Sequence, residues 1–117
     1  MKVGAIYVGE RCVVPRVWQA ASFFDRMRGL LGRPPLQAGE GMLIGDCGMV
    51  HTIGMRYALD VAFIDRAGQV RKLVRHLAPT RMAGCLGACT TLELAAGAVD
   101  ALGLRQGDKV KWEEVAA

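Results

Sequence analysis

The sequence predicts a small, β-rich α+β domain, namely a curved or barrel-like, mainly antiparallel sheet with one or two short helices. Segments of strand length, rich in Val, Ile, Tyr and Trp, recur along the chain. The 15 glycines separate these segments with turns. Apolar residues recur at helical spacing in short segments only. The 117 residues suit one domain spanning 1–117, and their 52% hydrophobic content is enough for a core without disulfides or metal.

The first two predicted strands cover residues 3–8 and 11–18, with Gly9 in the tight turn between them. Pro15 lies inside the second strand. Because proline cannot donate a ladder hydrogen bond, we expect an edge strand or a bulge there.

Two helices are predicted. The first covers 23–32, where Ser22 is placed to be the N-cap and Gly32 to end the helix. The second is short and covers 97–102, with Gly103 at its end.

The remaining strands are predicted from apolar or alternating segments, which are 42–46, 59–65, 70–74, 90–94 and 109–112. Gly68 suits a left-handed turn position, so 59–65 and 70–74 should form a β-hairpin. Residues 36–41 and 76–88 are predicted loops. The segment 47–56 is compatible with a loop, a bulge or a strand.

Charge and cysteine content restrict the partners and the compartment. The formal charge is +4, but Lys and Arg are spread along the chain, so nucleic acid is not an expected partner. No run of 18 apolar residues predicts a membrane span, and the N-terminal segment does not resemble a secretory signal. Four cysteines in a chain without such a signal predict reduced thiols and a cytoplasmic location.

Several collinear motifs give the chain a family resemblance. They are Arg26–Arg33 (RMRGLLGR), Gly39–Leu43 (GEGML), His51–Arg56 (HTIGMR), Leu59–Asp65 (LDVAFID), Leu92–Gly97 (LELAAG) and Gly103–Val110 (GLRQGDKV). In this order they resemble the DUF192 family, also called UPF0127. The resemblance covers about residues 23–112 and implies a compact, β-rich α+β domain without an assigned reaction, cofactor or partner.

The candidate ligand-binding residues are His51, Thr52, Arg56 and Asp60. Arginine offers a rigid fork for a carboxylate or phosphate, and histidine titrates near neutral pH. These residues predict a small binding or accessory module that holds an anionic small molecule or a peptide terminus. One alternative is a small enzyme with His51 and Asp60 as acid and base. Another is a protein-interaction domain in which the cluster is an internal network, with Arg56 paired to Asp60 or Asp65.

The cysteines offer two further hypotheses. Cys47 precedes His51 by four residues, but in an extended segment their side chains would lie about 13 Å apart, too far for a catalytic pair. Cys47, His51, Cys85 and Cys89 together have loose zinc-like spacing. The simpler interpretation is that Cys85 and Cys89 pack as small hydrophobic residues, that Cys12 belongs to the core, and that no metal or other cofactor is required.

Glu93 lies between Leu92 and Leu94 on a predicted strand and must point away from both. We expect it to face either solvent or a second polar layer that includes Arg56.

Overall fold

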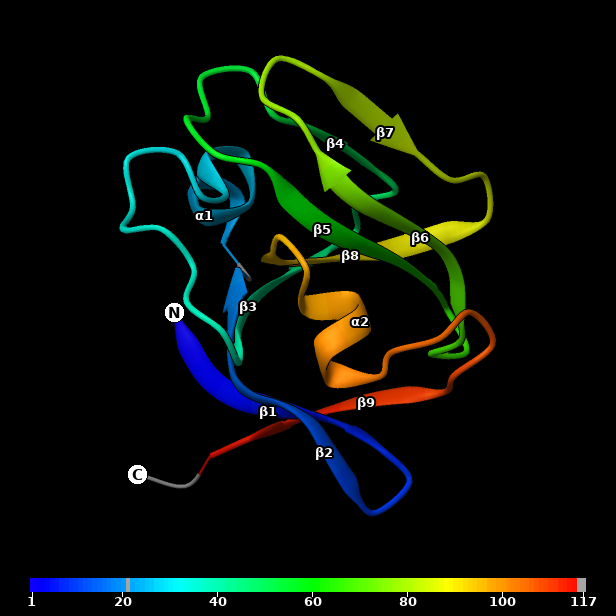
Figure 1. The fold of residues 1–117 in the computed structure, drawn as a ribbon. Coiled ribbons are helices and arrows are strands. Elements are labelled where there is room, and N and C mark those ends of the chain that lie inside the picture. The colour runs from blue at the N-terminus through cyan, green and yellow to red at the C-terminus, as the bar shows by residue number, and fades with distance from the viewer. Residues whose placement is uncertain (21, 116–117) are drawn as a thin grey trace.

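The structure is a computed structural model that describes residues 1–20 and 22–115 (Figure 1). Within this part of the chain, seven strands form one sheet in the order β6-β5-β8-β3-β2-β1-β9, and β4 and β7 form a separate two-stranded ribbon. The strands are β1 (Lys2–Val8), β2 (Arg11–Ala20), β3 (Glu40–Gly45), β4 (Met49–His51), β5 (Leu59–Asp65), β6 (Val70–Leu77), β7 (Met82–Gly84), β8 (Ala88–Ala95) and β9 (Val110–Glu114). The helices are α1 (Phe23–Arg28) and α2 (Ala98–Leu102).

The large sheet is mainly antiparallel, as predicted, with β2 and β3 as its one parallel pair in the described residues. Its two edges approach each other at a single bridge between Gln69 and Lys109. The sheet is therefore strongly curved but does not close into a barrel. The predicted α+β class is confirmed.

Alternation along β5 and β8 divides the buried side chains between the two faces of the sheet. One face carries the α2 core, which includes Ala62, Ile64, Leu92, Leu94 and Val99. The other face carries the α1 core, which includes Leu30, Val50, Leu59, Val61 and Phe63. In Figure 1 α2 lies within the curve of the sheet near the middle of the view, whereas α1 lies at the upper left and the β4–β7 ribbon lies across the top. Neighbouring residues of one strand thus have different surroundings.

Both predicted helices are present, but the first is shorter than expected. The Ser22 hydroxyl accepts a hydrogen bond from the Asp25 N–H at 3.1 Å, so the predicted N-cap is confirmed. The helix ends early because Gly29 takes a positive φ of 52° and turns the chain. The second helix matches its prediction and ends at Gly103, whose φ is 71°.

The predicted loop over 76–88 was partly wrong, because β6 continues to Leu77 and Met82–Gly84 form β7. This short strand pairs with Met49–His51, which settles the structure of the segment left open in the sequence. Such three-residue strands are too short to show a period in the sequence.

Two further local expectations were tested. Pro15 lies at a bulge between β1 and β2, and β2 is an interior strand, so the bulge is confirmed and the edge strand was wrong. Cys12 was wrongly assigned to the core, because it lies at the exposed end of the β1–β2 hairpin. No helix in the described residues is long and apolar enough to cross a membrane.

Candidate functional site

Thr52, one of the four predicted ligand-binding residues, is buried and holds the loop before β7. Its hydroxyl donates a hydrogen bond to the Ala78 carbonyl at 2.6 Å and accepts one from the Arg81 N–H at 2.8 Å. Its main chain bonds the same loop, through its N–H to Arg81 and its carbonyl to Thr80. The Thr52 hydroxyl therefore has its partners within the protein.

Asp60 is also buried, and it lies on the α2 face of the sheet. Its two carboxylate oxygens accept hydrogen bonds from the backbone N–H groups of His76 and Val99, each at 2.9 Å. The second bond caps the N-terminus of α2, and the first holds His76 at a positive φ of 52°. Asp60 thus positions two backbone segments.

His51 and Arg56 are exposed and line different cavities on the α1 side. The structure therefore does not bring the four predicted residues together, and His51 and Asp60 are not an acid–base pair. The expected pairing of Arg56 with Asp60 or Asp65 was wrong. The Asp65 carboxylate instead accepts hydrogen bonds from its own turn and lies 3.8 Å from Arg71.

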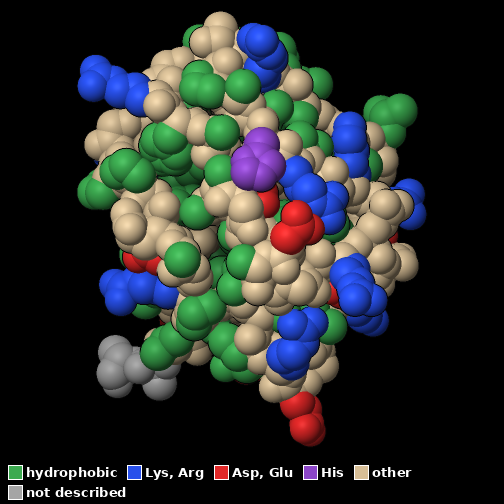
Figure 2. Space-filling model, in the orientation of Figure 1, with side chains coloured by type: hydrophobic (Ala, Val, Ile, Leu, Met, Phe, Trp, Pro, Cys, Tyr) green, Lys and Arg blue, Asp and Glu red, His purple; other side chains and the backbone are tan. Residues whose placement is uncertain are grey.

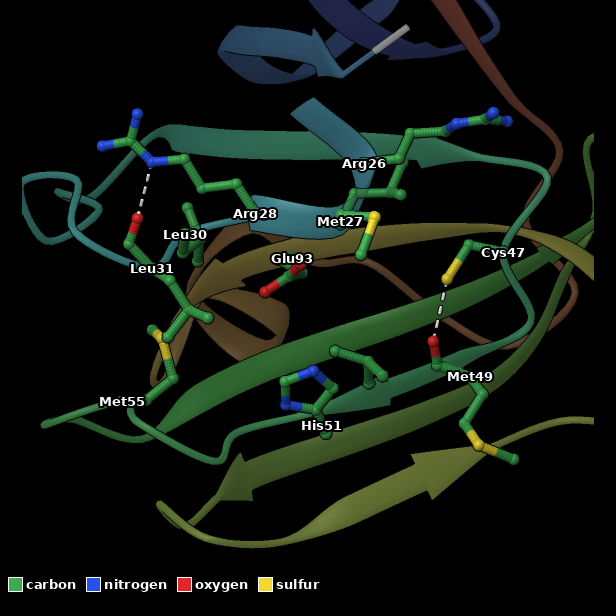
Figure 3. Close-up of a pocket in the computed structure, with 13 residues that line it drawn as sticks. Arg26, Met27, Arg28, Leu30, Leu31, Cys47, Met49, His51, Met55 and Glu93 are labelled. Carbon is green, nitrogen blue, oxygen red and sulfur yellow. Dashed lines mark hydrogen bonds between the residues drawn. The ribbon is translucent and has the colours of Figure 1, made fainter. Parts of the chain in front are cut away.

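A small cavity of about 70 Å³ lies between α1 and β4, and we call it the α1–β4 pocket. Figure 3 shows that side chains from α1, β4 and β8, and from the loops after α1 and β4, surround this pocket. Its lining comprises Arg26, Met27, Arg28, Gly29, Leu30, Leu31, Ile44, Cys47, Met49, Val50, His51, Met55 and Glu93. The pocket thus combines apolar walls with one carboxylate, one imidazole and several sulfur atoms.

Glu93 lines the α1–β4 pocket and is a functional candidate that was not among the four predicted ligand-binding residues. Only 4% of the residue is exposed, and burial is the one cause of its pKa shift, with no contribution from a hydrogen bond or ion pair to a described residue. Its ladder neighbours are Met42 on β3 and Val61 on β5, both buried and apolar. Gly29 at the end of α1 covers it closely, since a Cβ there would lie 3.6 Å from Glu93 Oε1.

Burial in these apolar surroundings raises the pKa of Glu93 from 4.5 to about 7. Of the two predicted surroundings, solvent was wrong, and Arg56 lines the neighbouring cavity rather than this one. The signal available in the sequence was a single charged residue between leucines of a strand. The position of Glu93 becomes informative only once α1 is known to cover the face of the sheet to which its side chain points.

The arginines at the rim of the pocket are engaged elsewhere. Arg26 pairs with Asp46 at 3.1 Å. Arg28 donates hydrogen bonds to the carbonyl oxygens of Leu31 and Gly32 at 2.8 and 3.1 Å, and Figure 3 shows the first of these bonds. These guanidinium groups therefore do not neutralise Glu93 by direct contact.

A second cavity, of about 480 Å³, adjoins the first at Leu30 and Met55. The hydroxyl of Tyr57 in its lining is buried without a hydrogen-bond partner among the described residues. Burial raises the pKa of Tyr57 above 10.0, the charge of nearby Glu93 raises it further, and the nearby Leu36 backbone lowers it in part. A second unpaired polar group thus lies close to the floor of the α1–β4 pocket.

The predicted zinc set is not assembled. Cys47 Sγ donates a hydrogen bond to the Met49 carbonyl at 2.8 Å, and Cys85 Sγ lies 3.5 Å from the Leu86 carbonyl. Cys89 is half-buried beside Thr90. Within the described residues, no three side chains of His, Cys, Asp or Glu gather to hold a metal ion.

The fold places this chain in the class of small α+β domains with a large, curved mixed sheet. The sequence matches the DUF192 family, described as an uncharacterized ACR, over residues 6–112. The chain belongs to the DUF192 family. No curated protein matches it.

Two crystal structures are similar to this chain. A protein of unknown function from Novosphingobium aromaticivorans is 23% identical, with a TM-score of 0.75 over 96% of this chain and 84% of its own. A putative transcription regulator from Sinorhizobium meliloti is 25% identical, with a TM-score of 0.79 over 95% of this chain and 92% of its own. Because the Novosphingobium protein is only 23% identical, its similarity to this chain concerns the fold alone.

Proposed function

We propose that this protein is a binding module that holds a small positively charged ligand in the α1–β4 pocket, with the Glu93 carboxylate as its counter-charge. The observation that carries the proposal is the largely buried Glu93 carboxylate at the floor of a cavity, where burial alone, without an ion pair or hydrogen bond from a described residue, shifts its pKa. Burying an unpaired charge is costly, so proteins pair such groups or use them. A cation or a hydrogen-bond donor entering the pocket would supply the missing partner.

The size and walls of the pocket favour a compact ligand. A cavity of about 70 Å³ has room for one ammonium group or one ion, with few or no accompanying waters. Leu30 and Ile44 are buried apolar residues in its wall. A ligand with a large polar surface would lose its hydration there without replacement.

The anionic ligand expected from the sequence is less well supported. An anion would require Glu93 to be protonated, and Arg26 and Arg28 already have partners. Arg56 beside the second cavity is the residue that remains for such a ligand. On the face in Figure 2, Lys and Arg side chains are scattered among hydrophobic ones rather than gathered in a stripe, which favours a small ligand over nucleic acid.

Two-dimensional amide NMR with methylammonium and acetate as probes tests this proposal. We expect methylammonium to give saturable shifts at residues of α1, β4 and β8, and acetate to give none at these residues. Glu93→Gln keeps the side-chain shape without the charge and should abolish the methylammonium shifts. Glu113→Gln, on an exposed residue of β9, should leave them unchanged. Saturable acetate shifts instead, or methylammonium shifts that survive Glu93→Gln, would overturn the proposal.

A further inference from the structure

We propose that the outer face of the β4–β7 ribbon is a docking surface for an anionic lipid bilayer, with its apolar side chains inserted between the lipid headgroups. We call this surface the ribbon face and define it by Met49, His51, Ile53, Met82 and Leu86. The inference goes beyond the proposed function, because it concerns the outside of the ribbon and requires no ligand in the α1–β4 pocket.

The pairing of β4 with β7 explains why these side chains share one surface. Along β4 the buried Val50 alternates with exposed neighbours, so Met49 and His51 point outward together. On β7, Met82 lies directly opposite His51, and Gly84 lies opposite Met49. Gly84 leaves room for the methionine side chain, since a Cβ at position 84 would lie 3.6 Å from Met49 Cε.

The large apolar side chains of the ribbon face are exposed rather than packed. Met49, Ile53 and Met82 are 59%, 54% and 62% exposed. Leu86, in the turn after β7, is 98% exposed. Because apolar side chains gain free energy by leaving water, an exposed cluster of them on a folded domain marks an interaction site.

Positive charges lie at both ends of the ribbon. Lys72 reaches it from β6 and donates a hydrogen bond to the Gly84 carbonyl at 2.9 Å. The guanidinium of Arg71 lies against the turn after β7, since a Cβ at Gly87 would lie 3.0 Å from Arg71 Nη2. Arg81 is exposed beside the opposite end of β7. The ribbon face is therefore flanked by cations.

Acidic residues are few around the ribbon and have basic neighbours. The segments 47–53 and 80–87, which form the ribbon and its ends, contain no Asp or Glu. Asp46 pairs with Arg26 at 3.1 Å, and Asp65 lies 3.8 Å from Arg71. In the upper part of Figure 2, where the ribbon lies in Figure 1, hydrophobic and basic side chains of described residues are visible and acidic ones are not. This charge distribution complements negative headgroups.

The composition of the ribbon face favours a bilayer over a protein partner. The segments 47–53 and 80–87 contain no Trp, Tyr or Phe, whereas Trp and Tyr are enriched among the residues that dominate the energy of protein interfaces. Ile53 and Leu86 lie in turns, where aliphatic side chains can enter a lipid layer without a shaped groove to receive them. Apolar insertion combined with attraction between Lys or Arg and anionic lipid is how peripheral proteins bind membranes.

Co-sedimentation with extruded vesicles measures this binding on the full chain. We expect binding to vesicles of equal parts phosphatidylcholine and phosphatidylglycerol, and weaker binding at high salt or to phosphatidylcholine alone, because the attraction depends on surface charge. Ile53→Ser and Leu86→Ser should each lower the partition coefficient by about tenfold, since burial of one such side chain is worth at least that factor. Val115→Ser, at an exposed valine beyond β9, is the matched control and should bind as the wild type does.

The substituted side chains are exposed, so all three variants should keep the thermal midpoint of the wild type. No binding of the wild type to the mixed vesicles would overturn the inference. Binding that salt weakens but that Ile53→Ser and Leu86→Ser leave unchanged would also overturn it, because charge alone would then hold the protein. If the wild type dimerises in sedimentation velocity, the serine variants do not, and vesicles bind neither, the ribbon face binds a second copy and the lipid inference is wrong.

Discussion

Replacing Glu93 with glutamine should remove a pH dependence of folding stability that this one carboxyl group creates. Its pKa is raised to about 7 in the folded protein from the ordinary value of 4.5, because it is 4% exposed and lies among apolar neighbours. This difference corresponds to about 3 kcal/mol of stability, an order-of-magnitude figure.

The sign follows from proton binding. Between pH 4.5 and about 7 the folded protein holds the Glu93 proton more tightly than the unfolded chain does, so raising the pH favours unfolding. The contribution of protonated Glu93 is fully present below pH 4.5 and is lost above about pH 7. Glutamine does not titrate. Relative to the wild type, Glu93→Gln should therefore gain stability steadily across this range.

Urea denaturation at several pH values from about 4 to 8 measures this difference directly. Comparing the wild type with Glu93→Gln cancels the contributions of the other carboxyl groups. Glu113→Gln, on the exposed end of β9, should follow the wild-type curve at every pH. If the free energies of unfolding of the wild type and Glu93→Gln stay parallel from pH 4 to 8, the reasoning about burial is refuted.

Three further substitutions separate internal residues from accessible ones. Asp60→Ala should destabilise the protein by about 3 kcal/mol, because two backbone N–H groups lose a charged acceptor, and urea denaturation measures it. Thr52→Val should cost about 1–3 kcal/mol by leaving the Ala78 and Arg81 backbone groups without their partner; equal stability to the wild type would contradict the hydrogen bonds assigned to it. His51→Ala should change stability by about 0.5 kcal/mol or less, since the residue is exposed, and a large loss in a thermal melt would mean that its side chain is part of the core.

The strands of the sheet were predictable from the sequence because their signal is local. The segment Leu59–Asp65 has the composition of a strand, and Gly68 fixes the following hairpin with a φ of 88°. The end of α1 could not be predicted, because the helix stops at Gly29. The apolar residues after Gly29 continue the helical spacing, so the sequence showed no sign of a stop there. The β4–β7 ribbon joins two segments about 30 residues apart, so no local pattern could reveal it.

The predicted cluster around His51 failed for a reason of geometry. Asp60 is close to His51 in the sequence, but alternation along β5 directs Asp60 to the α2 face, where it caps Val99. His51 lies on the α1 side instead. Sequence proximity indicated one site, whereas the intervening sheet separates the two residues.

Glu93 shows the opposite case, in which the local prediction was correct but incomplete. The alternation with Leu92 and Leu94 correctly directed its carboxylate to the other face of β8. Whether that face is wet depends on α1 and Gly29, which come from a segment about 60 residues earlier. Burial by a distant element cannot be derived from the pattern of a single strand.

The most direct test of the account is the titration of the Glu93 side-chain carboxyl carbon, followed by NMR on selectively labelled protein from about pH 3 to 9. We predict a midpoint near pH 7, which is the behaviour of a carboxyl group buried without an internal partner at the floor of the α1–β4 pocket. A midpoint near 4.5 would contradict the account, because it would mean that this carboxyl group is solvated or already paired.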